Sequence, residues 1–195
     1  MRVSREKFAQ NREKILDAAG ELFRERGFDG IGVADIMKAA GMTHGGFYGH
    51  FSSKDELAFE ASKALAARAA ERWQEVVDGA EEPLPALLGH YLSRRNLEDR
   101  SKGCIFASLT QEVSRHGGEM QSAFTDGLLS LAKILEEIVP GETEAARRRR
   151  AIASLSAMMG AVILARALDD GDLAYEFLEA TRQELLPAAG DTGGD

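Results

Sequence analysis

The chain has 195 residues, one cysteine and a net charge of −8, which allows one or two small domains and excludes an internal disulfide. Its longest apolar run, residues 157–165, is nine residues long and therefore too short to cross a bilayer. The first residues, MRVSREKFAQNREK, contain no apolar stretch of the kind that a signal peptide requires. We therefore expect a cytoplasmic protein that is not bound to a membrane.

The charged residues are unevenly distributed along the chain. Residues 1–57 hold nine basic and nine acidic side chains, whereas residues 58–195 hold 15 and 23 and carry the entire net charge. The first 14 residues hold five basic and two acidic groups. A neutral N-terminal part with a basic tip is compatible with binding to nucleic acid, although the charge of the whole chain does not suggest it.

Apolar residues recur at helical spacing almost throughout, and no segment shows the sustained alternation of a strand. We therefore predict an all-α fold of about nine helices, in which a three-helix N-terminal head precedes a C-terminal helical bundle. The first helix is predicted over residues 7–26, and a glycine at position 27 ends it. Its buried stripe comprises Ile15, Ala18, Ala19, Leu22 and Phe23.

Two short helices are predicted next, over residues 33–40 and 44–50, and about three residues join them. A glycine ends the first, and Thr43 is a suitable N-cap for the second. Phe47 and Phe51, four residues apart, form the apolar side of the second helix. One long and two short helices with a glycine-containing turn are typical of the helix-turn-helix, whose last helix reads the major groove of DNA.

The rest of the chain is predicted to be helical as well. Ser53 and Glu56 form the pattern of a capping box and predict a long helix that extends to about residue 77. From Pro187 onward the sequence is expected to be disordered. Further helices are predicted over residues 84–98, 104–116, 120–138, 143–169 and 172–186.

Two stretches of the N-terminal region carry a family pattern: the spaced residues IL–AA–ELF–E–GF of the first helix, and GMTHGGFYGHFSSKDEL at residues 41–57. Together they resemble the TetR family of transcriptional repressors over about residues 12–57. The resemblance implies a homodimer that binds a palindromic operator in double-stranded DNA and is released by a small-molecule effector. It also implies a helix-turn-helix DNA-binding domain at residues 1–53, a ligand-binding and dimerisation domain at residues 54–195, and neither enzymatic activity nor a cofactor.

The resemblance assigns contacts with DNA to residues on or next to the predicted helix 44–50. The N-terminal residues of such a helix approach bases or the DNA backbone, and later residues contact phosphate groups. The corresponding residues of this chain are Thr43, His44, Gly45, Tyr48, His50 and Lys54.

Three glycines depart from the family pattern. Gly32 stands where the family often has a Ser or Thr that binds a phosphate, and Gly46 and Gly49 stand where many members have larger polar residues. Because glycine costs about 1 kcal/mol relative to alanine inside a helix, either DNA approaches the bare backbone closely or the helix orders fully only on DNA. The same departures support an alternative function, a helical interaction module that no longer binds DNA specifically.

Cys104 has the most specific interpretation in the C-terminal part. It follows Gly103 in the first turn of a predicted helix, with Arg100 and Lys102 just before it, and a helix N-terminus with nearby cations favours the reactive thiolate. The string GCIFASLTQEVSR resembles a branch of the family that includes repressors sensing electrophiles and oxidants through a cysteine. The alternative is a small side chain packed at the start of a helix. An enzyme with Cys104 as nucleophile is not supported, because no base or orienting partner is recognisable.

The four histidines do not predict a metal site. His44 and His50 are six residues apart and therefore do not share a helix face. His90, His116 and Cys104 show no recognisable ligand spacing.

Residues 151–168 are apolar or small almost without exception, and a helix of that kind requires partners on all sides. Together with the last helix it predicts a four-helix interface between two copies of the chain. The alternative is a central helix buried in a monomer. The candidate interface residues are Ala157, Gly160, Ala161, Leu164 and Phe177.

Large apolar residues on helices that enclose the ligand pocket in the family are candidates for contact with an apolar effector. The alternative for each of them is plain core packing. With Cys104 as the candidate sensor, these residues are Trp73, Tyr91, Phe106, Phe124 and Met158.

Overall fold

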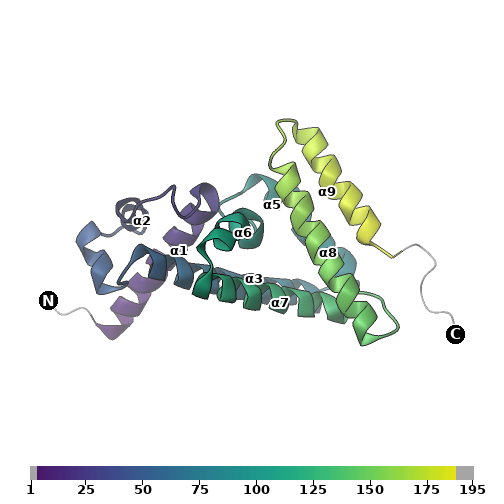
Figure 1. The fold of residues 1–195 in the computed structure, drawn as a ribbon, viewed down its shortest axis with the longest axis horizontal. Helices are drawn as coiled ribbons and strands as arrows, with labels where there is room; N and C mark the ends of the chain where they lie inside the picture. Colours follow the sequence, from purple (N-terminus) through teal and green to yellow (C-terminus); the bar gives the residue numbers. More distant parts are fainter. Residues whose placement is uncertain (1–3, 188–195) are drawn as a thin grey trace. The chain divides into compact units, whose positions relative to one another are not determined.

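A computed structural model describes residues 4–187, and over that range the chain contains helices and no strand (Figure 1). The prediction of an all-α fold with about nine helices is confirmed, since the described chain has nine α-helices and one short 3-10 helix, η1. Among these helices, none combines the length and the hydropathy that a membrane span needs. The residues after 187, for which disorder is predicted, lie outside the described part. The elements are α1 (Arg5–Arg26), α2 (Val33–Ala39), η1 (His44–Gly49), α3 (Lys54–Asp78), α4 (Pro83–Tyr91), α5 (Arg94–Glu98), α6 (Ile105–His116), α7 (Gly118–Ile138), α8 (Glu144–Ala165) and α9 (Gly171–Leu185).

The chain divides into two compact units by its contacts. Unit 1 combines the chain up to Ala67 with Arg100–Thr125, and unit 2 combines Arg68–Asp99 with the chain from Asp126 onward. The long helices α3 and α7 each contribute to both units. The sequence predicts a DNA-binding domain that ends at residue 53. That boundary separates functional roles, whereas the two units are defined by contacts, so the boundary stays a prediction.

The first helix begins and ends at residues whose local chemistry explains both ends. The Ser4 hydroxyl accepts a hydrogen bond from the Lys7 N–H at 3.1 Å, so α1 begins two residues earlier than predicted. Gly27 adopts a φ of 75° and its N–H donates to the Phe23 carbonyl, an ending that favours glycine. Of the predicted stripe, Ile15, Ala19 and Phe23 are buried, and Ala18 and Leu22 are half-buried.

The single helix predicted over residues 84–98 is wrong, because the structure has two helices there, α4 and α5. The break falls at Leu92, whose ψ of 59° is not helical. Ser93 then caps α5 by accepting from the Asn96 N–H at 3.3 Å, and the Asn96 amide donates to the Tyr91 carbonyl at 2.8 Å. These side chains satisfy backbone groups that a continuous helix would have paired.

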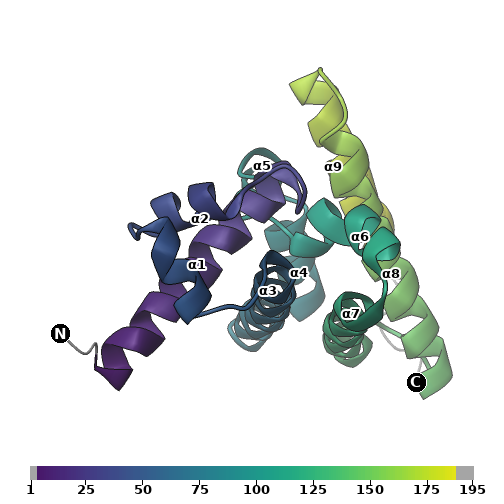
Figure 2. The same ribbon diagram turned by 60° about the vertical axis from the view of Figure 1, so that its left-hand side comes forward.

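In unit 2, α8 and α9 lie side by side and pack against each other (Figures 1 and 2). The Thr143 hydroxyl accepts from the Ala146 N–H and begins α8, whereas the Asp170 carboxylate accepts from the Asp172 and Leu173 N–H groups and begins α9. The sequence predicts that α8 extends to residue 169, whereas in the structure it ends at Ala165. Its inner side buries Ala151, Leu155, Met158, Val162 and Ala165.

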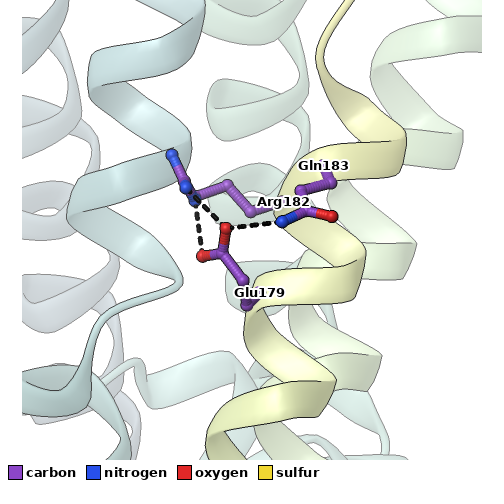
Figure 3. Close-up of polar contacts among 3 residues, drawn as sticks. All are labelled: Glu179, Arg182 and Gln183. Atoms are coloured by element: carbon purple, nitrogen blue, oxygen red, sulfur yellow. Dashed lines mark hydrogen bonds and ion pairs between the residues drawn. The ribbon is translucent and has the colours of Figure 1, made fainter.

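A short polar network stabilises the second half of α9 (Figure 3). The Glu179 carboxylate accepts hydrogen bonds from Nε of Arg182 at 2.9 Å and from a terminal guanidinium nitrogen at 2.6 Å. Gln183 donates to the same carboxylate at 2.9 Å. These hydrogen bonds, and the charge of Arg182, lower the pKa of Glu179 to about 2. The carboxylate therefore stays ionised at acidic pH values at which an ordinary glutamate is protonated.

Candidate nucleic-acid interface

The turn between α2 and η1 is tight and glycine-dependent. Gly41 has a φ of 73°, a left-handed conformation that side chains other than glycine rarely adopt. Its N–H donates to the Lys38 carbonyl, and the Met42 N–H donates to the Met37 carbonyl at 2.8 Å. Within unit 1, α2 packs against both α1 and η1. The structure therefore contains the predicted long helix, short helix, turn and short second helix.

The second short helix differs from the prediction in its type. The structure has a six-residue 3-10 helix, His44–Gly49, rather than an α-helix over residues 44–50. Three of its six residues are glycines, which lowers the intrinsic stability of an α-helix. Thr43 occupies the N-cap position, as predicted. Its side chain makes no capping hydrogen bond, however, so it does not stabilise the beginning of η1 in the predicted way.

Two phenylalanines anchor η1 to unit 1. The Phe47 and Phe51 side chains are only 1% and 2% exposed, and their ring centroids are 5.9 Å apart. Both residues therefore form the apolar side that the sequence predicts. Because η1 is short and rich in glycine, this anchoring, rather than the helix itself, determines where its outer side lies.

The outer side of η1 presents four of the six residues predicted to contact DNA. Thr43, His44 and Gly45 are exposed, and Tyr48 is 68% exposed. The rings of His44 and Tyr48 meet edge to face with their centroids 6.4 Å apart. We call these four residues the reader surface. It carries hydroxyl, imidazole and phenol groups next to a bare backbone at Gly45, and such groups donate and accept hydrogen bonds.

The other two predicted DNA contacts lie beyond this surface. Lys54 is the first residue of α3 and is half-buried. His50 is half-buried as well, and its imidazole stacks on the Phe8 ring of α1 at a centroid distance of 4.2 Å. Burial, and then the nearby charge of Arg12, lower the pKa of His50. His50 is thus a packed ring rather than an extended cationic side chain.

The capping box predicted at the start of α3 is present in a shifted form. The Ser53 hydroxyl accepts from the Glu56 N–H at 3.0 Å, as predicted. The Glu56 carboxylate, however, accepts from the N–H and the hydroxyl of Ser52 rather than from Ser53. These two hydrogen bonds lower the pKa of Glu56. The junction between η1 and α3 is therefore closed by two serines and one glutamate.

The candidate effector residues fall into separate groups. Phe106 and Phe124, in unit 1, are buried and meet edge to face at 5.2 Å. Trp73 and Tyr91, in unit 2, are buried and meet edge to face at 5.5 Å, and Met158 is fully buried in the same unit. All five side chains take part in core packing, which is the alternative that the sequence left open for them.

Cys104 lies at the N-cap of α6 rather than in its first turn, and it is half-buried. Its carbonyl accepts from both the N–H and the hydroxyl of Ser108. Arg100 and Lys102, which precede it, are exposed. The thiol is thus neither fully enclosed nor at the open surface.

The candidate dimer residues lie on different sides of α8 and α9. Leu164 and Phe177 are 55% and 38% exposed, whereas Ala161 is 5% exposed and packs within the chain. Ala157 and Gly160 are half-buried. Sequence reasoning missed three further large apolar residues that are exposed, two on α8 and one on α9. The two on α8 were missed because an all-apolar helix gives no periodicity from which to choose a face. With Leu164 and Phe177, the three residues form what we call the dimer face: Ile152, Ile163 and Leu173.

No group of three or more His, Cys, Asp or Glu side chains within residues 4–187 is arranged to hold a metal ion.

Sequence reasoning also missed two residues of α1, Phe8 and Arg12, that contact the end of η1. Phe8 is 42% exposed and lies seven residues before Ile15, so it continues the apolar stripe of α1 by one step of helical spacing, and that spacing was the signal that could have identified it.

The geometry of unit 1 agrees with the similarities of this chain to known proteins. Residues 15–61 match the family described as bacterial regulatory proteins, tetR family. The HTH-type transcriptional repressor KstR2 of Mycolicibacterium smegmatis is 32% identical over 85 residues, which cover 44% of this chain and 42% of that protein. The chain thus spans about two fifths of the KstR2 length. The HTH-type transcriptional repressor NemR of Escherichia coli K12 is 26% identical over 137 residues, or 68% of this chain and 69% of NemR.

Solved structures share the fold over almost the whole chain. The crystal structure of reduced E. coli NemR has a TM-score of 0.75 at 23% identity, and covers 90% of this chain and 95% of that one. A TetR-family regulator from Cytophaga hutchinsonii has a TM-score of 0.77 at 20% identity, and covers 95% and 96%. The N-terminal match and the shared fold agree with the pattern at residues 41–57. Residues 15–61 thus match the tetR family of bacterial regulatory proteins, and the described chain shares the fold of the solved regulators.

Proposed function

We propose that the protein is a homodimeric transcriptional repressor that binds a palindromic operator in double-stranded DNA through η1. The observation that carries this proposal is the reader surface. Its exposed Thr43, His44 and Tyr48 side chains are held outward by the buried Phe47 and Phe51. A rigidly anchored helix with polar groups on its outer side suits the major groove, where bases present hydrogen-bond donors and acceptors.

The residues of this region have separate roles in the proposal. Thr43 and His44, at the beginning of η1, contact base edges and so determine sequence preference. Tyr48 and Lys54 contact phosphate groups, which positions the protein without reading sequence. Gly45 carries no side chain, and a Cβ there would meet nothing within 4 Å, so the DNA backbone can approach closely at this point.

The dimer face supports the homodimer. Ile163, Leu164 and Phe177 are each between 38% and 55% exposed, and exposed apolar patches of this kind mark interaction sites. A second copy of the chain provides the same apolar face, so two-fold symmetry covers both at once. Two readers related by that symmetry match two half-sites about 34–36 Å apart.

Release from DNA is proposed to begin in the C-terminal part, through a small apolar ligand or through an electrophile or oxidant acting at Cys104. Cys104 caps α6, and α6 packs against α1 within unit 1. The Glu112 carboxylate of α6 accepts from the Phe28 N–H, just after α1, at 2.6 Å. A change at Cys104 therefore affects α6, which packs directly against α1, the helix that supports the reader surface.

One observation supports a second function. η1 is a short 3-10 helix with three glycines, and a helix of this kind has little intrinsic stability. A helical interaction module that no longer reads DNA would tolerate such a segment. The two functions differ in whether the protein selects a DNA sequence.

Selection of bound sequences from a random pool of DNA duplexes, at low salt, tests the proposal. We expect enrichment of a sequence with inverted half-sites, and an affinity that falls steeply as salt increases. Absence of any enriched sequence would reject the repressor and leave the interaction module.

For the sensor, Cys104→Ser should abolish release by an oxidant such as hydrogen peroxide while DNA binding persists. Unchanged release would assign Cys104 to packing alone.

A further inference from the structure

The first turns of α1 contact the carboxyl end of η1 through two side chains. Phe8 and Arg12 are four residues apart and therefore lie on the same face of α1. The Phe8 ring stacks on the His50 imidazole, with 4.2 Å between centroids and 27° between planes. The Arg12 guanidinium lies over the Phe51 ring, 4.8 Å from its centroid. Two consecutive residues after η1 are thus each covered by one side chain of α1.

We call Phe8 and Arg12 the α1 clamp. Both residues precede the segment 15–61 that matches the family. A stacked ring pair and a cation over an aromatic face are both favourable contacts. Arg12 is also held from the other side, because it pairs with Glu60 of α3 at 3.6 Å.

η1 needs such support because it is short and rich in glycine. At its beginning it rests on α2, where a Cβ added to Gly46 would lie 3.6 Å from the Met37 side chain. At its end the His50 and Phe51 N–H groups both donate to the Phe47 carbonyl, at 2.8 and 3.0 Å, and the side chains of these two residues contact the α1 clamp. A 3-10 helix of six residues with three glycines cannot fix its own direction.

The surroundings of His50 show how the clamp uses its ring. The Nδ1 atom is buried and has no hydrogen-bond partner among the described residues. The charged groups around it are Arg12 from α1 and, next to Arg12, Glu56 and Glu60 from α3. Burial and the positive charge of Arg12 both lower the pKa of His50. A proton on this imidazole would be placed beside a cation and against an apolar ring.

We propose that Phe8 and Arg12 are positioning residues for DNA binding, which fix the carboxyl end of η1 by covering His50 and Phe51. His50 acts in this arrangement as a neutral aromatic ring, not as a cationic phosphate contact. The inference rests on the proposed DNA-binding function, because the clamp matters only if the orientation of the reader surface matters.

The clamp is tested in two ways, and the first needs no DNA. The imidazole C–H resonances of His50 are followed by NMR as pH is lowered, in the full-length protein. The wild type is expected to titrate below the ordinary value for histidine, about 6.5. Phe8→Ala and Arg12→Ala should each move this titration upward. Phe8→Tyr keeps the ring, and Gln10→Ala changes an exposed residue of the same helix, so both should titrate as the wild type does.

The second test measures affinity for the selected operator duplex at a fixed pH and salt. Phe8→Ala is expected to bind about tenfold more weakly, which corresponds to one stacked ring pair. Phe8→Tyr and Gln10→Ala should stay within about twofold of the wild type. His50→Phe keeps a neutral ring against Phe8 and should retain affinity within about threefold, whereas His50→Ala should lose about tenfold.

Each outcome decides the proposal. If Phe8→Ala moves the His50 titration but leaves DNA affinity unchanged, the clamp has no positioning role. A loss of affinity without a change in the His50 titration would mean that Phe8 acts elsewhere, and the proposal fails. Equal losses in His50→Phe and His50→Ala would make His50 a direct phosphate contact. A wild type that binds no duplex would reject the proposed function instead, while the NMR test would still judge the clamp.

Discussion

The reader surface in unit 1 and the dimer face in unit 2 present opposite chemistry to their surroundings. On η1 the exposed side chains are those of Thr43, His44 and Tyr48, which carry hydrogen-bonding groups. On α8 and α9 the large exposed side chains include Leu164 and Phe177, which carry none. The first surface suits a polar, charged polymer such as DNA, and the second suits another apolar protein face.

The two regions also differ in what maintains their shape. η1 has six residues, three of them glycine, and depends on Phe47 and Phe51 beneath it. α8 has 22 residues, is capped by Thr143 and packs along α9. A long capped helix is stable enough to tolerate exposed apolar groups, whereas η1 takes its structure from its contacts. Substitutions should therefore affect assembly in unit 2 and local order in unit 1.

The largest expected effect is on the dimer face. Changing Leu164 and Phe177 together to glutamate would place two carboxylates in each copy of an apolar interface, and burying unpaired charge costs several kcal/mol per ion. We expect a monomer by analytical ultracentrifugation at micromolar concentration, with loss of operator binding. Lys133→Glu, an exposed change on α7, is the matched control and should remain dimeric. A double variant that stays dimeric would show that these helices do not form the interface.

The next largest effect is expected beneath the reader surface. Phe47→Ala removes a ring that is 1% exposed and should lower the free energy of unfolding by about 3–5 kcal/mol. Urea denaturation followed by circular dichroism measures this change. Phe47→Leu keeps most of the apolar volume and should cost less than about 1.5 kcal/mol. A loss below about 1 kcal/mol for the alanine variant would contradict the view that η1 depends on this anchor.

The roles within the DNA contact should separate in a third experiment. His44→Ala should change the preferred sequence by about 1–3 kcal/mol at one base position. Lys54→Ala should instead weaken all sequences alike and reduce the slope of log affinity against log salt by about 1. Binding selections with both variants provide the measurement. If the two variants lose affinity equally on every sequence, the division into reading and positioning residues is wrong.

A smaller effect is expected at Gly49. A Cβ at this position would meet nothing within 4 Å, and its φ is not among the positive values of the described glycines. Gly49→Ala should therefore raise the free energy of unfolding by up to about 1 kcal/mol. We also expect slightly tighter DNA binding, because less ordering is needed on DNA. A clear loss of affinity, in a variant of raised stability, would instead show that DNA approaches the bare backbone there.

The smallest expected effect concerns pH and compares the two units directly. Burial, followed by Arg72 and Arg95, lowers the pKa of His90 in α4, so its folded form resists protonation as His50 does in unit 1. The stability that neutral His90 contributes is complete above about pH 6.5 and is lost as the pH falls through the lower folded value. We expect less than about 1 kcal/mol between about pH 7.5 and 5.5. His90→Gln should remove this part of the pH dependence in urea denaturation, and an unchanged pH profile would contradict it.

The sequence by itself determined the features that depend on neighbouring residues. The turn at Gly41, the apolar pair Phe47 and Phe51, and the cap at Ser53 each involve residues only a few positions apart. Local conformation and helical spacing control such features, so the helix-turn-helix and the all-α class could be predicted. The resemblance to the TetR family, rather than a local signal, assigned DNA contacts to Thr43, His44, Gly45 and Tyr48, and the structure exposes all four.

Only the tertiary structure decided the features that depend on distant residues. His50 carries the same sequence signal whether it extends to a phosphate or packs beneath Phe8, and a contact across about 40 positions decides between them. The uniformly apolar α8 gives no signal for which side faces inward, so Ala161 and Leu164 could not be distinguished. The break at Leu92 likewise depends on side-chain hydrogen bonds to the backbone that compete with helix formation. Packing selects among conformations that the local sequence allows equally, and the orientation of the reader surface is one of them.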